Sequence, residues 1–274
     1  MVGGFVGLTA DGCRMISIMT KKYALLVSLI AIVGSAVAPS GAATSTTEAP
    51  RCTVGIRAGK LIDPERGEVL RDQMIRIAGE RILAVGASRD GGLRDCARTI
   101  DLSKSTVLPG LIDTHTHVTS DPTVLRYERL GISIPRLALI GAANARRTLL
   151  AGFTTIRNLG ADGYADVALR DAINAGDVPG PRMIVSGPGI GITGGHCGSN
   201  LLAPEFKQTS LGTADGPDEV RKAVRQNVRY GADVIKYCGT GGVFSKGTQP
   251  GLQQFTAEEV TALVLSLIHI SEPT

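Results

Sequence analysis

The sequence has 274 residues, of which 43% are hydrophobic and 35 are glycines, enough for one large domain or two small ones. Lys and Arg outnumber Asp and Glu by 29 to 25, a net charge of +4 with no basic stripe, which argues against a nucleic-acid-binding protein. The five cysteines include no Cys-x-x-Cys pair, which argues against a zinc ribbon or a dithiol redox motif.

The first residues have the layout of a start codon assigned too far upstream, at residues 1–18, followed by a secretory signal peptide. Residues 1–18 show no pattern, whereas Met19 opens a segment with two lysines and then an apolar run over residues 23–33. This layout is typical of a signal peptide, and the apolar stretch is short for a membrane span of about 20 residues. We expect a signal peptide at residues 19–42, export to the periplasm or outside the cell, and membrane contact only through this segment. An uncleaved anchor is the alternative.

A linker at residues 43–52 leads into a β-rich lobe that we place at residues 53–108. Turn-forming residues separate its apolar runs, which is the pattern of short strands. The strands are expected at residues 53–57, 74–77 and 81–85, with turns at residues 63–67 and 78–80. Periodicity alone fits any small all-β module.

The cysteines give one hypothesis about this lobe. Cys52 and Cys96 flank it, so in an exported protein these two residues can form a disulfide. Cys13, Cys197 and Cys238 are expected to be small buried residues rather than metal ligands.

An apolar run then ends in two histidines, His115 and His117, separated by one residue. Alternate side chains of a β-strand point to the same face, so both imidazoles can reach one space. Two imidazoles at a strand end suit a divalent metal such as zinc. Ordinary loop histidines are the alternative, but the apolar lead-in and the Pro-Gly turn before it favour the metal-binding interpretation. Asp113, in the same strand, is expected to be a structural hydrogen-bond acceptor.

After the histidines the pattern alternates between strand and helix, which predicts a parallel sheet with outer helices. The helices are expected at residues 134–151, 164–175 and 218–230, and the strands at residues 153–157, 182–186 and 232–237. Another helix is expected to begin at Thr256, because Thr256 and Glu259 have the spacing of a capping box. In a barrel of such units, chemistry gathers at the carboxyl ends of the strands, where Lys236 lies with the two histidines.

Lys236 lies in an apolar strand, where an unpaired ammonium is costly to bury. Burial makes the neutral amine accessible, and that amine can react with carbon dioxide to give a carbamate able to bridge two metals. A lysine whose charged end reaches solvent is the alternative. His196 lies in a Gly-rich loop whose backbone can approach a ligand closely, with a purely structural role as the alternative. Tyr237 and Arg157 are weaker candidates for contact with a substrate carboxylate.

These motifs resemble a known family. Pro109–Val118 resembles the first barrel strand of the amidohydrolase superfamily, and residues 53–264 resemble its imidazolonepropionase-like branch, which includes Xaa-Pro and Xaa-Arg/Lys dipeptidases. The resemblance implies an α/β fold, a (β/α)8 TIM barrel with a β-sandwich lobe that the family assembles from both chain ends. About the first four βα units are expected here, at residues 109–264, beside a partial lobe.

The same resemblance implies the metal ligands. The family's matching lysine is carboxylated, so His115, His117 and Lys236 would bind two divalent metal ions, with zinc expected and a carbon dioxide-derived carbamate on Lys236. His196, and more weakly Tyr237, would lie near the substrate. The family's remaining ligands are two histidines from strands five and six, and its general acid/base is an aspartate from strand eight. The catalytic residue is therefore not assigned within this sequence.

The last ten residues, 265–274, look like a translated sequencing adapter, so we expect a truncated read and leave His269 out of the ligand set. A native tail is the alternative, since polar residues and proline commonly follow a helix.

The resemblance implies a hydrolase of amide C–N bonds, most simply a dipeptidase of the prolidase kind, acting on a dipeptide or another small molecule. Cyclic amides are the alternative substrates, and a non-catalytic binding domain is the alternative of another class. Zinc stoichiometry would separate these classes. The chain as given is expected to show no turnover, and a homo-oligomer is left open.

Overall fold

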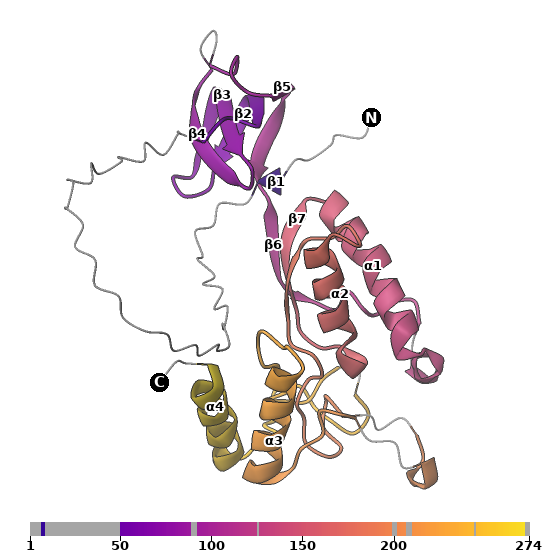
Figure 1. Cartoon of the computed structure of the whole chain (residues 1–274). Helices are drawn as coiled ribbons and strands as arrows, with labels where there is room; N and C mark the ends of the chain where they lie inside the picture. Colours follow the sequence, from indigo (N-terminus) through magenta and orange to yellow (C-terminus); the bar gives the residue numbers. More distant parts are fainter. Residues whose placement is uncertain are drawn as a thin grey trace, which may run out of the picture. The chain divides into compact units, whose positions relative to one another are not determined.

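A computed structural model of the chain describes residues 7–8, 50–88, 92–124, 126–198, 202–206, 210–243 and 245–271. The chain divides into two compact units, residues 10–107 and residues 108–274 with residues 1–9, and each is described by itself (Figure 1). The predicted signal peptide and Cys13 lie outside the described residues. Within the described ranges, every helix is too short or too polar to serve as a membrane span.

The first unit is a mixed β-sheet. Its strands are β2 (Val54–Asp63), β3 (Glu68–Ala78), β4 (Arg81–Ala87) and β5 (Arg98–Pro109), in the order β5-β2-β3-β4. β2 pairs antiparallel with β3 and parallel with β5, and β3 pairs antiparallel with β4. A two-residue strand of the second unit, β1 (Gly7–Leu8), pairs in parallel with Leu108 and Pro109, the last two residues of β5, which also belong to that unit.

The turn between β2 and β3 forms where the sequence predicts it. The carboxylate of Asp63 accepts hydrogen bonds from the backbone N–H groups of Glu65 and Arg66, at 3.1 and 3.2 Å. Gly67 completes the turn with a φ of 68°, a left-handed conformation that glycine adopts without a steric penalty.

The strands of this lobe are longer than predicted, and β5 was missed. Much of β3 and β5 is polar and exposed, so an apolar pattern marks only short parts of them. Their length comes from backbone pairing with β2, which lies between them and buries Ile56 and Ala58. The hypothesis of a Cys52–Cys96 disulfide is confirmed, with the two Cα atoms 4.5 Å apart.

The second unit contains a parallel sheet of three strands with helices packed on it. The strands are β6 (Leu111–Thr116), β7 (Phe153–Asn158) and β8 (Arg182–Val185), in that order. The helices are α1 (Ile134–Leu150), α2 (Ala165–Ala175), α3 (Gly216–Arg229) and α4 (Ala257–Ser271), with 3-10 turns η1 (Arg126–Gly131), η2 (Asp162–Tyr164) and η3 (Pro204–Phe206). The alternation of strand and helix is confirmed.

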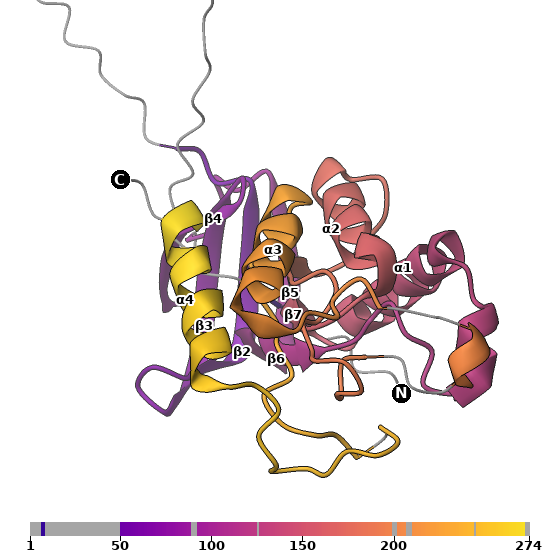
Figure 2. The same cartoon turned by 90° about the horizontal axis from the view of Figure 1, so that it is seen from below.

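Two apolar clusters hold this unit together. The first joins the sheet to α1 and α2 through buried residues such as Ile156, Leu169 and Val185. The second joins α3 and α4 through residues such as Val224 and Leu263. α1 accordingly lies beside α2, and α3 beside α4 (Figures 1 and 2).

The predicted strand at residues 232–237 is wrong as a regular strand. The segment forms only an isolated parallel bridge, between Tyr237 and Ile190. Its first residues do not form a regular ladder with β8, because the N–H of Val185 donates to the Asp233 carboxylate, at 2.9 Å, instead of to a backbone carbonyl of this segment. The carbonyl of Val185 accepts from the N–H groups of both Asp233 and Val234. The segment still follows the end of β8, which places Lys236 beside Ile190.

The predicted capping box at the start of α4 is confirmed. The N–H of Glu259 donates to the Thr256 hydroxyl at 3.3 Å, and the N–H of Thr256 donates to the Glu259 carboxylate at 2.8 Å. The same carboxylate accepts from the N–H of Gly216, at the start of α3, at 2.7 Å. One side chain therefore caps two helices. α4 continues through residues 265–271, part of the segment interpreted as adapter-derived.

The start of α2 has an unusual backbone. Tyr164 has a φ of 60°, in the left-handed region that side chains other than glycine rarely adopt. Its hydroxyl donates to the Oδ1 atom of Asn227 on α3 at 3.0 Å. The contact ties the first turn of α2 to α3.

Candidate metal centre

His115 and His117 converge at the carboxyl end of β6. Their ring centroids are 5.3 Å apart, with the ring planes tilted by 59°. The register against β7 shifts between Asp113 and Thr116, and the Asp113 carboxylate accepts the N–H of His115 at 3.0 Å. Asp113 thus has the structural acceptor role that the sequence predicts. Thr116 turns toward β7, where its hydroxyl donates to the carbonyl of Arg157 at 3.2 Å.

The surroundings of His117 favour its neutral form. Desolvation by neighbouring protein atoms is the main cause that lowers the pKa of His117, although the residue as a whole remains exposed to solvent. The charges of His115, Lys236 and Arg129 lower this pKa further, and a hydrogen bond to the Gly160 backbone opposes the shift. A neutral imidazole is the form that binds a metal ion.

The structure brings Lys236 to the same neighbourhood. Its carbonyl accepts the N–H of Ile190 at 2.8 Å, which fixes the segment just beyond β8. The side chain is half-buried, and its charge lowers the pKa of both His117 and His196. Lys236 is thus close enough to both histidines to act on them electrostatically.

His196 is held by residues that the sequence analysis missed. Its Nδ1 atom lies 2.5 Å from the Ser245 hydroxyl, and its N–H donates to the Gln254 side chain at 3.1 Å. A Cβ at Gly242 would lie 2.0 Å from Nδ1, so only glycine fits against the ring. Burial, followed by the charge of Lys236, lowers the pKa of His196.

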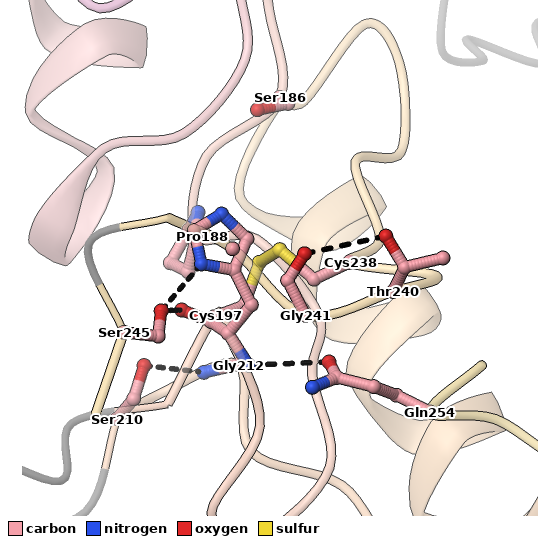
Figure 3. Close-up of a disulfide and its surroundings, with 12 residues drawn as sticks. Ser186, Pro188, Cys197, Ser210, Gly212, Cys238, Thr240, Gly241, Ser245 and Gln254 are labelled. Atoms are coloured by element: carbon pink, nitrogen blue, oxygen red, sulfur yellow. Dashed lines mark hydrogen bonds between the residues drawn. A yellow bond between two sulfur atoms is a disulfide. The ribbon is translucent and has the colours of Figure 1, made fainter. Parts of the chain in front are cut away.

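A disulfide joins the segments that carry His196 and Lys236. Cys197 and Cys238 are bonded, with Cα atoms 5.8 Å apart, and Figure 3 shows them between the two segments. The expectation of small buried cysteines holds for the burial of Cys238, which is 4% exposed, but it missed the bond. Nothing in the spacing marks this pair, because the fold brings them together from 41 positions apart.

The weaker candidates have packing partners. The Tyr237 ring meets Phe255 edge-on, with centroids 5.9 Å apart. The Nε atom of Arg157 donates to the carbonyl of Thr114 at 2.8 Å and links β7 to β6. Their contact with a substrate stays a prediction.

The donor set fits a metal centre in kind, because imidazole nitrogen is a ligand that zinc prefers. Across the residues that the structure describes, no three His, Cys, Asp or Glu side chains gather into a group able to hold a metal ion. The described residues therefore supply two imidazoles and one nearby lysine, which is part of a coordination sphere.

The sequence matches the model of the Amidohydrolase family over residues 106–270. The chain therefore belongs to the amidohydrolase family. Members of this family are generally metal-dependent, and the alternating strands and helices described above are those of its TIM-barrel-like α/β fold.

Particular relatives agree with this assignment. Ochratoxinase from Aspergillus niger is 34% identical over 239 residues, covering 80% of this chain and 48% of the relative. A crystal structure of a Xaa-Pro dipeptidase with bound methionine in the active site is 36% identical, with a TM-score of 0.68, covering 79% of this chain and 54% of that one. A prolidase complexed with N-methylphosphonate-L-proline is 32% identical, with a TM-score of 0.67, covering 79% and 53%. The chain spans about half the length of the curated relatives it matches.

Proposed function

We propose that this chain carries the His115–His117 part of the metal centre of an amide-bond hydrolase. The observation that carries the proposal is the convergence of the two imidazoles at the end of β6, with the Lys236 charge acting on one of them. Relatives named Xaa-Pro dipeptidase, prolidase and ochratoxinase support amide hydrolysis. A dipeptide is the substrate class that we propose.

The proposed ligands are His115, His117 and Lys236, the last as a carbamate. Two divalent ions, with zinc as the expected metal, would supply polarisation of the scissile carbonyl and activation of water. The lowered pKa of His117 keeps the imidazole free to bind metal near neutral pH. A carbamate converts Lys236 from a repelling cation into an anion that suits two cations.

His196 has a different proposed role. Its Nδ1 atom is engaged by Ser245, which leaves Nε2 as the nitrogen available to a substrate. The lowered pKa favours the neutral ring, which is suited to a hydrogen bond with an amide or a carboxylate. Residues Ser245 and Gln254 would hold the ring in place.

Export also belongs to the proposal. The apolar run after Met19 supports it, and so do the two disulfides, since disulfides persist in oxidising compartments.

Zinc binding to the 274-residue chain tests the metal assignment. We expect binding by calorimetry that falls by about 100-fold or more in His115→Ala and His117→Ala, because each loses a direct ligand. The matched control is His196→Ala, which removes an imidazole outside the ligand set and should leave zinc affinity within about twofold. Equal binding by all three variants would disprove the assignment.

The carbamate and the reaction have separate tests. After incubation with ¹³C-bicarbonate and zinc, we expect a carbamate signal by NMR that Lys236→Arg abolishes. A protein that contains this chain should hydrolyse Xaa-Pro dipeptides in a zinc-dependent way. Such a protein that binds zinc but cleaves no dipeptide or cyclic amide would overturn the proposed activity.

A further inference from the structure

Asp166, at the start of α2, is a buried carboxylate to which the proposed function gives no role. Its side chain is 0% exposed. Burial raises the pKa of this carboxyl, and hydrogen bonds from Asn158, Gly187 and Val167 oppose the shift. A buried carboxylate is costly unless N–H groups surround it, so these contacts fix where the group lies.

Two of the contacts join Asp166 to the ends of neighbouring strands. Its Oδ2 atom accepts a hydrogen bond from Nδ2 of Asn158, the last residue of β7, at 3.2 Å. The same atom accepts the N–H of Gly187, just beyond the end of β8, at 3.1 Å. Its Oδ1 atom accepts the N–H of Val167, within α2, at 2.9 Å. One carboxylate therefore ties the start of α2 to the carboxyl ends of two strands.

The first of these contacts leads to His117. The Oδ1 atom of Asn158 accepts the N–H of Val118, the residue after His117, at 2.8 Å, and both Asn158 and Val118 are buried. The NH2 end of an amide donates and its oxygen accepts, so the contact with Asp166 sets the amide with its oxygen toward Val118. The backbone directly after His117 thus depends on Asp166.

The second contact leads to Lys236. Gly187 has a φ of 63°, and a Cβ there would lie 2.8 Å from the Tyr164 ring, so the turn requires glycine. Three residues later, the N–H of Ile190 donates to the Lys236 carbonyl at 2.8 Å, and the Ile190 carbonyl accepts the N–H of Cys238 at 2.9 Å. The backbone of Lys236 is therefore held by a short segment that begins at Gly187.

We propose that Asp166 is a positioning residue that sets the place of His117 relative to Lys236. It is the shared partner of two chains of contacts, one through Asn158 to the residue after His117 and one through Gly187 to the Lys236 segment. That His117 and Lys236 bind metal rests on the proposed function, whereas their placement by Asp166 does not.

NMR signals of the two positioned side chains test this in the metal-free chain. The chain has four histidines, so ¹⁵N-histidine labelling gives few ring signals, and His117→Gln assigns the one of interest. ¹³C-lysine labelling with Lys236→Met assigns the other signal. Asp166→Asn keeps the size of the side chain but replaces one acceptor by a donor that meets N–H groups. Both signals should therefore shift by more than their line widths.

Two variants at Asn158 test the separate chains of contacts. Asn158→Leu removes only the contacts that lead to His117, because Gly187 and Val167 still hold Asp166. It should shift the His117 signal and leave the Lys236 signal in place. The exchange variant Asn158→Asp/Asp166→Asn again sets an amide against a carboxylate, with the amide at position 166 as the donor. Both signals should return toward their wild-type positions.

Ile173 provides the control for loss of stability alone. It lies on the same helix as Asp166, toward the other end, and packs against the first apolar cluster. Ile173→Ala should lower thermal stability by removing packed methyl groups, and it should leave the His117 and Lys236 signals unchanged.

Zinc affinity adds a second measurement that depends on the proposed function. It should fall by about 10-fold in Asp166→Asn, the lower end of the range for residues that support a metal ligand, but not in Ile173→Ala. A wild-type chain that binds no zinc would refute the metal assignment, and the two NMR signals would still decide the role of Asp166.

The positioning role would be overturned if Asp166→Asn left either signal in place, or if Ile173→Ala shifted both signals as far. Should Asp166→Asn not fold, Asn158→Leu decides the question. An unshifted His117 signal in that variant, or an equal shift of the Lys236 signal, would then contradict the proposal.

Discussion

Each of the two units is closed by one disulfide, and the two bonds have different surroundings. Cys52–Cys96 spans 44 positions and Cys197–Cys238 spans 41, so their expected effects on the unfolded chain are nearly equal. The first joins the start of the β-lobe to the segment before β5. The second joins the loop of His196 to the segment of Lys236 (Figure 3). The first disulfide stabilises its unit. The second stabilises its unit and also holds the loop of His196 against the segment of Lys236.

The largest expected change in stability comes from removing either disulfide. Replacing both cysteines of either pair by serine should lower the free energy of unfolding of its own unit by about 4 kcal/mol, from the entropy of the released loop. Hydrogen exchange resolved by region measures the effect in each unit. Only the Cys197→Ser/Cys238→Ser variant should also shift the His196 signal in histidine spectra. A shift of that signal in the Cys52→Ser/Cys96→Ser variant would contradict the distinction.

A smaller difference is expected from one ion pair in each unit. Arg170 is 14% exposed and donates to Asp233 at 2.8 Å and to the carbonyl of Gly231 at 2.6 Å. Arg170→Met should cost about 2 kcal/mol, because it leaves a carboxylate and a carbonyl with fewer donors.

The counterpart in the lobe is Arg76, which pairs with Asp95, a side chain that is 61% exposed. Arg76→Met should cost about 0.5 kcal/mol and lose its effect in high salt, because water screens an exposed pair. Urea unfolding at low and high salt measures both variants. An equal loss of unfolding free energy in both variants would show that the burial of an ion pair does not determine its contribution to stability here.

The last comparison concerns two carboxylates, and its expected effect depends on pH. Hydrogen bonds from the Thr256 and Gly216 backbone lower the pKa of Glu259, which is 7% exposed. Because the folded pKa lies below the ordinary value of 4.5, this stabilisation is present above pH 4.5 and is lost as pH falls through the folded pKa. Glu259→Gln should therefore cost about 1 kcal/mol at pH 7 and progressively less in acid.

Asp101 in the lobe is the contrasting carboxylate. Hydrogen bonds from Ser103 lower its pKa too, but the group is fully exposed. Because water screens its interactions, Asp101→Asn should change the pH dependence of unfolding less than Glu259→Gln does. Thermal unfolding between pH 3 and pH 7 compares the two variants, and a matching pH dependence would refute the contrast.

The sequence predicted the parts of the molecule that local pattern encodes. Apolar periodicity and glycine stops located the helices, Thr256 and Glu259 marked a capping box, and the spacing of His115 and His117 marked a shared face. These signals succeed because each depends on residues within a few positions of one another.

The missed features depend on contacts between distant parts of the chain. Ser245 and Gln254 reach His196 from 49 and 58 positions away, and no local motif announces them. The Cys197–Cys238 bond is of the same kind. Asn158 lies one residue beyond the strand predicted at residues 153–157, and only the structure shows its hydrogen bonds to Val118, after β6, and to Asp166 of α2.

The left-handed backbone at Tyr164 has a consequence for the order of assembly. Such a conformation costs roughly 1 kcal/mol for a residue with a side chain, and its hydroxyl contact with Asn227, 63 positions further on, helps to offset that cost. This hydrogen bond can form only after α3 has packed against the start of α2. Because α3 follows α2 in the chain, a growing chain gains this contact only after α3 has been synthesised.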